Sequence, residues 1–351
     1  MKNILLYCRP GFENECAIEF LDKTKNYGQR KIISDVAGSG YVVCGFPLKE
    51  IAELCINSLD FKSLIFSRQM ILCSDLICSL PKGNRIFPII NELKKTNIIF
   101  SDIFIEMPDT NEGKKLSKLC KSLFDVFKKE LKKENMLLEN NGLKRLHIFF
   151  IATDKAYYGI SNKFNASNWQ MGIPRLKFPY GAPSRSALKL EEAFYTFLPE
   201  NDNSLKKGAM AIDLGASPGG WSWVLVNNGL KVIAIDNGKL NKNVLNTNRV
   251  THLKTNAFTF RPNHAFDWMV CDIVEKPKLI ANLICKWLIK KWCKYTIFNL
   301  KLPMKKKYEE IKKCKYYIMS NLEKNKIRYN FYIKQLYHDR EEVTGFINLK
   351  K

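Results

Sequence analysis

An apolar strand that runs directly into a glycine-rich turn constrains the fold of this chain most. The run Met210–Leu214 is apolar apart from Asp213, and the turn Gly215–Gly220 that follows holds three glycines. Glycine lets a backbone approach a ligand closely, and the helix-like segment after the turn offers free N–H groups. The turn matches neither the dinucleotide nor the triphosphate glycine pattern. It predicts a nucleotide-type ligand loop in an α/β domain, and the bend at Ser217-Pro218 favours a ligand that carries a carboxylate and an amine.

An acidic residue follows the next apolar strand. The strand Lys231–Ile235 ends in Asp236, which lies 21 residues after Gly215. An acid about 20 residues beyond such a turn binds ribose hydroxyls in parallel α/β sheets. We therefore expect Asp236 to contact the ribose of an adenosine group. Asn256 follows the next apolar segment, His252-Leu253, and is a candidate to contact the edge of the adenine ring. Asp213 is expected to hold the backbone of the loop.

Two further strands end in charged residues. Asp272 follows Asp267–Cys271, and Lys301 follows Tyr295–Leu300. Strands separated by helix-like segments indicate a parallel sheet, whose ligands bind at the carboxyl ends of the strands. Asp272 and Lys301 therefore form a candidate acid–base pair beside the nucleoside pocket.

Two motifs that indicate particular methyl acceptors are absent from the sequence. Methylation of an exocyclic base amine uses Asp/Asn-Pro-Pro-Tyr/Trp, but Ile273-Val274-Glu275 follows Asp272. Methylation of a ring carbon uses a Pro-Cys pair, and no cysteine in the sequence follows a proline. A hydroxyl acceptor with a lysine base remains. A nicotinamide-dependent oxidoreductase is disfavoured by the absent third glycine and by Pro218.

The length of 351 residues predicts two domains. Residues 1–155 are predicted to form an α+β region, 156–183 an aromatic and basic linker, and 184–351 a parallel α/β domain. The expected strands are Ile4–Cys8, Tyr41–Cys44, Ile65–Cys73, Ile98–Met107, Ala209–Leu214, Lys231–Ile235, Asp267–Cys271 and Tyr295–Leu300. The expected helices are Glu13–Asp22, Lys114–Lys133 and Leu188–Phe197.

The formal net charge of +23 indicates a polyanionic partner such as nucleic acid, with compositional drift in an Asn-, Ile- and Lys-rich sequence as the alternative. The eight lysines of Lys114–Lys133 suit a phosphate backbone or a solvated face. The linker mixes aromatic and basic residues, which suits unstacked bases or packing between domains. These residues are Tyr157, Tyr158, Phe164, Trp169, Phe178 and Tyr180 with Lys163, Arg175, Lys177 and Arg185.

The eleven cysteines show no Cys-x-x-Cys and no zinc spacing with the four histidines, so no metal is expected. An odd count without a secretion signal indicates a reducing compartment, where thiols act as small buried hydrophobes. Because no apolar run reaches the roughly 18–20 residues that span a bilayer, we expect no membrane association and a cytoplasmic protein. We also expect a monomer.

The segment Asp213–Trp221 resembles the S-adenosylmethionine loop of the FtsJ-like 2′-O-ribose RNA methyltransferases. That resemblance implies a Lys-Asp-Lys-Glu catalytic set. In this sequence the set falls on Lys189, Asp272, Lys301 and Glu342, with Glu341 as the alternative for the last position.

Five further segments resemble the large-subunit ribosomal RNA methyltransferase family RlmM over nearly the whole chain: Tyr7–Glu13, Met171–Pro179, Val274–Pro277, Phe298–Lys306 and Leu336–Thr344. The resemblance implies that residues 1–155 are a THUMP-containing, ferredoxin-like RNA-binding region and that residues 184–351 are a Rossmann-like class I methyltransferase domain. It implies methylation of the ribose 2′-hydroxyl of one cytidine in the catalytic-centre loop of 23S ribosomal RNA, with S-adenosyl-L-methionine as cofactor. The implied cofactor contacts are Ser186, Ser217, Pro218, Gly219, Gly220, Asp236, Asn256 and Asp272.

The implied mechanism makes Lys301 the general base. A lysine has an ordinary pKa of about 10.4, so a lysine base must first lose its proton. The like charge of Lys189 favours that loss, whereas Asp272 and Glu342 oppose it, so the acids orient more than they activate. Two positions depart from the family pattern: Ser217 replaces a cysteine, and Asn256 replaces an aspartate and loses a charge. The competing hypothesis is an RNA-binding ribosome-assembly factor that has lost catalysis, and the intact set of four argues against it.

Overall fold

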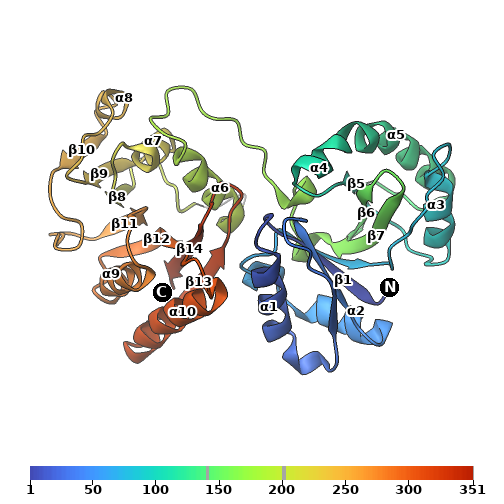
Figure 1. Cartoon of the computed structure of the whole chain (residues 1–351). Coiled ribbons are helices and arrows are strands. Elements are labelled where there is room, and N and C mark those ends of the chain that lie inside the picture. The colour runs from blue at the N-terminus through green and yellow to red at the C-terminus, as the bar shows by residue number, and fades with distance from the viewer. Residues whose placement is uncertain (140–141, 200–202, 351) are drawn as a thin grey trace. The chain divides into compact units, whose positions relative to one another are not determined.

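The computed structural model describes residues 1–139, 142–199 and 203–350. The chain divides into two compact units, Met1–Pro174 and Arg175–Lys351 (Figure 1). Each unit is built on its own seven-stranded sheet, which agrees with the two domains expected from the length.

The N-terminal unit has the strand order β2-β3-β1-β4-β7-β6-β5. Strands β5 and β6 run parallel, and the other neighbours in this sheet run antiparallel. The strands are β1 (Asn3–Tyr7), β2 (Lys31–Ser34), β3 (Tyr41–Gly45), β4 (Gln69–Cys73), β5 (Asp102–Glu106), β6 (Lys144–Ala152) and β7 (Lys155–Asn162). The helices are α1 (Glu13–Lys23), α2 (Lys49–Ser58), α3 (Ile86–Lys94), α4 (Asn111–Lys115) and α5 (Ser117–Lys133).

Helix α5 follows its predicted apolar spacing. Cys120, Phe127 and Leu131 are buried in a core that also includes side chains of α3, β5, β6 and β7, and the lysines of the helix lie on its polar side. The predicted helix Lys114–Lys133 is divided at Leu116, which separates α4 from α5.

Two predicted strands begin later than the sequence indicates. The strand expected at Ile65 begins at Gln69, because the backbone N–H groups of Ile65 and Phe66 donate to the buried carboxylate of Glu19 at 2.7 and 2.9 Å. The strand expected at Ile98 begins at Asp102, since Phe100 bonds instead to Met136 and Leu138, which lie outside the sheet.

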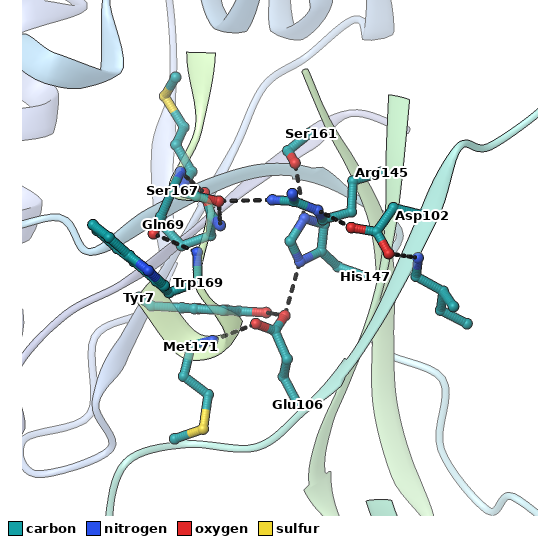
Figure 2. Close-up of polar contacts among 12 residues, drawn as sticks. Tyr7, Gln69, Asp102, Glu106, Arg145, His147, Ser161, Ser167, Trp169 and Met171 are labelled. Carbon is teal, nitrogen blue, oxygen red and sulfur yellow. Dashed lines mark hydrogen bonds and ion pairs between the residues drawn. The ribbon is translucent and has the colours of Figure 1, made fainter. Parts of the chain in front are cut away.

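A buried polar cluster fixes residues 167–171 to the N-terminal sheet (Figure 2). Glu106 accepts hydrogen bonds from the Tyr7 hydroxyl at 2.7 Å and from the backbone N–H of Met171, and contacts His147 Nδ1 at 2.8 Å. His147 Nε2 lies 2.8 Å from the Ser161 hydroxyl.

The same cluster holds Ser167. Arg145 pairs with Asp102 at 2.9 Å and donates to the Ser167 carbonyl at 2.7 Å, and Gln69 bonds both backbone groups of Ser167 (Figure 2). The prediction that the linker begins at residue 156 is therefore wrong for its first part. Residues 156–162 form most of β7, which pairs with β4 and β6, and its Tyr157 and Tyr158 are buried.

The C-terminal unit has the strand order β10-β9-β8-β11-β12-β14-β13. The strands from β10 to β12 run parallel, and β14 runs antiparallel to both of its neighbours. The strands are β8 (Met210–Leu214), β9 (Lys231–Ile235), β10 (Val250–Leu253), β11 (Phe266–Cys271), β12 (Cys293–Lys301), β13 (Tyr329–Lys334) and β14 (Glu342–Leu349). The predicted mostly parallel α/β sheet is confirmed.

Helices cover this sheet. They are α6 (Ala187–Phe197), α7 (Gly220–Asn227), α8 (Lys242–Leu245), α9 (Pro277–Ile289) and α10 (Lys307–Lys324). Helices α6 and α7 share one core with alternate residues of the central strands, among them Trp268, Val270 and Ile297, as the two-residue period of a strand requires. Helices α9 and α10 pack side by side (Figure 1).

Candidate active site

Topology places the site where the strand order reverses. From β8 the chain builds outward through β9 and β10 on one side, and through β11 and β12 on the other. Open α/β sheets bind ligands at the carboxyl ends of the strands beside such a point. Gly215 follows β8 and Asp272 follows β11, and β8 and β11 are hydrogen-bonded neighbours.

Strand register brings Glu342 to Lys301. In the antiparallel pair of β12 and β14, Lys301 lies directly opposite Glu342. The Glu342 side chain is 5% exposed and pairs through one oxygen with Lys301 and through the other with Lys189. A single carboxylate therefore bridges two ammonium groups that belong to a helix and to a strand end.

Lys189 completes the cluster. It lies on α6, and its Nζ is 3.3 Å from Asp272 Oδ2. The helix is held to the segment before β14 by buried Glu192, which accepts from the backbone N–H groups of Tyr337 and His338 at 2.7 and 2.9 Å. The structure thus brings together all four predicted residues of the catalytic set. Glu341, the alternative, is 65% exposed and pairs with Lys307 at 2.7 Å.

The charges in this cluster support one another. Burial alone would raise the pKa of Glu342, but Lys189 and Lys301 outweigh it and hold that pKa below its ordinary value. Burial would lower the pKa of Lys189, yet Asp272 and Glu342 raise it. Burial raises the pKa of Asp272 despite Lys189. Glu342 is therefore the carboxylate that remains ionised most readily in this group.

A second layer of polar residues, not predicted from the sequence, lies behind the cluster. Buried Asn299 donates to Asp272 Oδ1 at 2.8 Å, and its own carbonyl oxygen is 2.8 Å from the hydroxyl of Thr344. That hydroxyl also lies 3.0 Å from Asp339, which has no exposed surface and whose pKa is raised by burial and then by Glu342. These residues fix the orientation of Asp272. The sequence signal for Asn299 is a polar residue two positions before Lys301 in an apolar strand.

The glycine turn fits the predicted ligand loop. Gly219 has φ +111 and caps the N-terminus of α7. A Cβ on Gly220 would collide with the hydroxyls of Ser186 and Ser184. The backbone carbonyl of Ser186 also accepts a hydrogen bond from the indole N–H of Trp221 at 3.0 Å, so Ser186 lies against the turn.

Asp236 lies at the turn but makes contacts that the sequence did not predict. It accepts from the backbone N–H groups of Ser217 at 3.0 Å and of Gly238 at 2.6 Å. Asp236 thus holds the loop backbone, the role expected for Asp213. Asp213 instead accepts from the Ser222 hydroxyl of α7 at 2.7 Å and is 1% exposed.

The remaining predicted contacts lie around the same edge. Pro218 accepts a backbone hydrogen bond from Asn241 at 2.9 Å, and Ser217 donates its hydroxyl to Lys239 at 3.0 Å. Asn256 follows β10, is exposed, and accepts from the backbone N–H of Phe258 at 2.8 Å.

In the described residues, no group of three or more His, Cys, Asp or Glu side chains is arranged to hold a metal ion. Across that same part of the chain, no helix combines the length and the apolar character needed to cross a membrane. The cysteines are buried except Cys78, which confirms their prediction as core residues.

Three family models match consecutive parts of the chain. They are "RlmM ferredoxin-like domain" at residues 1–71, "Ribosomal RNA large subunit methyltransferase M, N-terminal" at 84–162 and "FtsJ-like methyltransferase" at 182–315. The expected ferredoxin-like region and methyltransferase domain are thereby confirmed.

Full-length relatives agree with these matches. Ribosomal RNA large subunit methyltransferase M of Proteus mirabilis is 44% identical over 99% of this chain and 96% of that protein. The proteins of the same description from Pectobacterium atrosepticum and Pasteurella multocida are 45% and 44% identical, over 98% and 100% of this chain and 95% and 99% of their own lengths.

Proposed function

Because the chain belongs to the ribosomal RNA large subunit methyltransferase M family, we propose that it methylates the ribose 2′-oxygen of a cytidine in 23S ribosomal RNA. The family makes it an S-adenosylmethionine-dependent methyltransferase of large-subunit ribosomal RNA. The finer assignment, to a ribose hydroxyl, rests on one observation: Glu342 bridges Lys301 and Lys189 at the strand ends beside the glycine turn.

The glycine turn supports S-adenosylmethionine as the cofactor. Side chains at Gly215 or Gly220 would meet Ile273 or the two serines, so glycine at both positions lets the turn pack closely on its neighbours. Ser217–Gly220 and Ser186 would hold the methionine part of the cofactor and Asp236 its ribose, with Asn256 and Asp272 completing the contacts. When bound, the cofactor supplies a methyl group on a positively charged sulfur, which a hydroxyl oxygen can attack.

Lys301 is the proposed general base. A ribose hydroxyl is a weak acid, so its proton must be accepted as the new carbon–oxygen bond forms. Lys301 is 31% exposed and Lys189 only 15%, so Lys301 is the amine that an acceptor can reach. As a neutral amine it takes the proton. Glu342 keeps the two amines at fixed positions, and Asp272 holds Lys189.

RNA binding is proposed for the N-terminal unit, as a THUMP-containing region, and for the linker. Tyr157 and Tyr158 are buried and take no part, but Phe164, Phe178 and Tyr180 are 81%, 50% and 102% exposed. Aromatic side chains among basic residues suit stacking on unpaired bases beside phosphates, which supports RNA contact by this segment. We further propose that the protein works as a monomer in the cytoplasm.

The test uses methyl-labelled cofactor and 23S ribosomal RNA from cells that lack this modification. After alkaline digestion, label in an alkali-resistant dinucleotide is expected, because cleavage requires a free 2′-hydroxyl. Label in mononucleotides would refute the ribose assignment.

Lys301→Ala should abolish transfer and leave the dissociation constant for the cofactor unchanged. Lys290→Ala, at an exposed lysine of the same unit, is the matched control. Turnover by Lys301→Ala at the rate of the control would remove Lys301 from the role of base.

A further inference from the structure

Two apolar side chains are exposed beside the catalytic set. Met304 is 95% exposed and Val274 is 77% exposed. Met304 lies three residues after Lys301, and Val274 lies two residues after Asp272. Single exposed apolar residues are common on protein surfaces. Here two of them lie in the loops that follow the neighbouring strands β11 and β12, beside Asp272 and Lys301.

The two loops share one edge of the sheet. Strands β11 and β12 are hydrogen-bonded and parallel, with Cys271 opposite Phe298, and neighbouring strands lie about 4.8 Å apart. The loop after β11 packs on the cofactor turn, since a Cβ on Gly215 would lie 2.5 Å from the side chain of Ile273. Val274 therefore follows a residue that touches the cofactor loop.

The loop after β12 is held at both ends by Glu341. The backbone N–H of Leu302 donates to the Glu341 carbonyl at 2.8 Å, and Lys307 pairs with its carboxylate at 2.7 Å. Residues 303–306 project between these attachments and are exposed. Met304 is thus presented to solvent from a segment with fixed ends.

Positive charge flanks the two apolar side chains. Lys305 and Lys306 follow Met304 directly, and Lys276 follows Val274 after one acid, Glu275; all four are exposed, so the net charge beside the two apolar side chains is positive. An apolar pair between lysines complements a nucleotide, whose base is flat and apolar and whose neighbouring phosphates are negative.

We propose that Val274 and Met304 hold the base of the acceptor nucleotide, with Lys276, Lys305 and Lys306 on its flanking phosphates. This inference rests on the proposed function. For its ribose to reach the Lys301 amine, the acceptor nucleotide must leave its stack in the RNA. Unstacking is unfavourable unless the protein covers the exposed nucleobase. The two side chains supply that cover, so they determine how well an acceptor is positioned.

The test compares Val274→Ala/Met304→Ala with the wild-type protein on two RNAs. One is unmodified 23S ribosomal RNA, and the other is the same RNA rebuilt by splint ligation with an abasic residue at the mapped acceptor position. On the complete RNA, kcat/KM should fall at least tenfold, with an unchanged dissociation constant for the cofactor. On the abasic RNA, the variant and the wild type should be equal.

Met304→Leu with native Val274 should restore most of the activity, and Tyr316→Ala, at a 75% exposed side chain on α10, is the matched control. Wild-type activity of the double variant on complete RNA, or an equal defect on both RNAs, would overturn the inference. The proposed function would survive either result, because it fails only if the wild type does not label a 2′-oxygen.

Discussion

The buried carboxyl of Asp213 should make the C-terminal unit less stable as the pH rises. One of its oxygens bonds to the Ser222 hydroxyl, and the other has no partner among the described residues. Burial raises the pKa of Asp213 from 3.8 to about 7, although the Ser222 hydrogen bond opposes the rise. The folded chain therefore keeps this proton to near neutrality, whereas the unfolded chain releases it near pH 4.

The direction and size of the effect follow from proton linkage. Between pH 4 and pH 7 the unfolded state binds fewer protons than the folded state, so the free energy of unfolding decreases with rising pH. A shift of about three pH units corresponds to at most about 4 kcal/mol. Between pH 5 and pH 8 the two titrations account for about 2–3 kcal/mol of lost stability.

Asp213→Asn should remove that 2–3 kcal/mol from the pH dependence. Urea unfolding at pH 5 and pH 8, followed by tryptophan fluorescence, measures it. The signal reports the correct unit, because five of the six tryptophans lie in residues 175–351. Ser222→Ala keeps the Asp213 carboxyl but removes the hydrogen bond that lowers its pKa. Between pH 5 and pH 8, the free energy of unfolding of this variant should therefore decrease at least as much as that of the wild type. Equal losses in the wild type and Asp213→Asn would refute the reasoning.

Three further perturbations test other parts of the structure. Asp236→Ala should weaken cofactor binding roughly 10- to 100-fold by calorimetry, because hydrogen bonds to a charged group contribute about 1.5–3 kcal/mol; an unchanged dissociation constant would contradict this. Glu106→Ala should destabilise the N-terminal unit by about 3–5 kcal/mol, seen as faster hydrogen exchange in β6, with cofactor affinity unchanged. Gly220→Ala should lower the free energy of unfolding by about 1–3 kcal/mol and weaken cofactor binding, since its Cβ meets two serine hydroxyls. Gly83→Ala, whose Cβ meets open space, is the control. Equal stability and cofactor affinity of the two variants would refute the close contact between Gly220 and the serines.

The parallel half of the C-terminal sheet could be predicted because each strand is a short apolar run closed by a glycine or a charged residue. The observed β8, β9, β11 and β12 lie within two residues of the expected bounds. The antiparallel β14 was not expected among them. Its pairing with β12 depends on a long-range register, which local periodicity does not encode, so Glu342 was placed only by family resemblance.

The backbone contacts predicted for Asp213 are made by Asp236, and Asp213 bonds to the Ser222 side chain instead. Position along the chain places Asp213 and Asp236 correctly at the ends of β8 and β9, but it does not show which backbone groups each carboxylate meets. The linker boundary failed for a similar reason. Tyr157 and Tyr158 look like linker aromatics by composition, yet their strand is buried by pairing with β4, a strand more than 80 residues earlier.

The position of β14 inside the sheet has a consequence for synthesis of the protein. β14 follows β13 in the chain but lies between β12 and β13, so neither strand can join the sheet before residue 342 and those after it exist. The N-terminal unit is complete at Pro174. At about 5–20 residues per second, on the order of 10–30 s separate that point from the arrival of Glu342. During this interval the N-terminal unit can already fold, and Lys189 and Lys301, once made, still lack the Glu342 carboxylate that joins them.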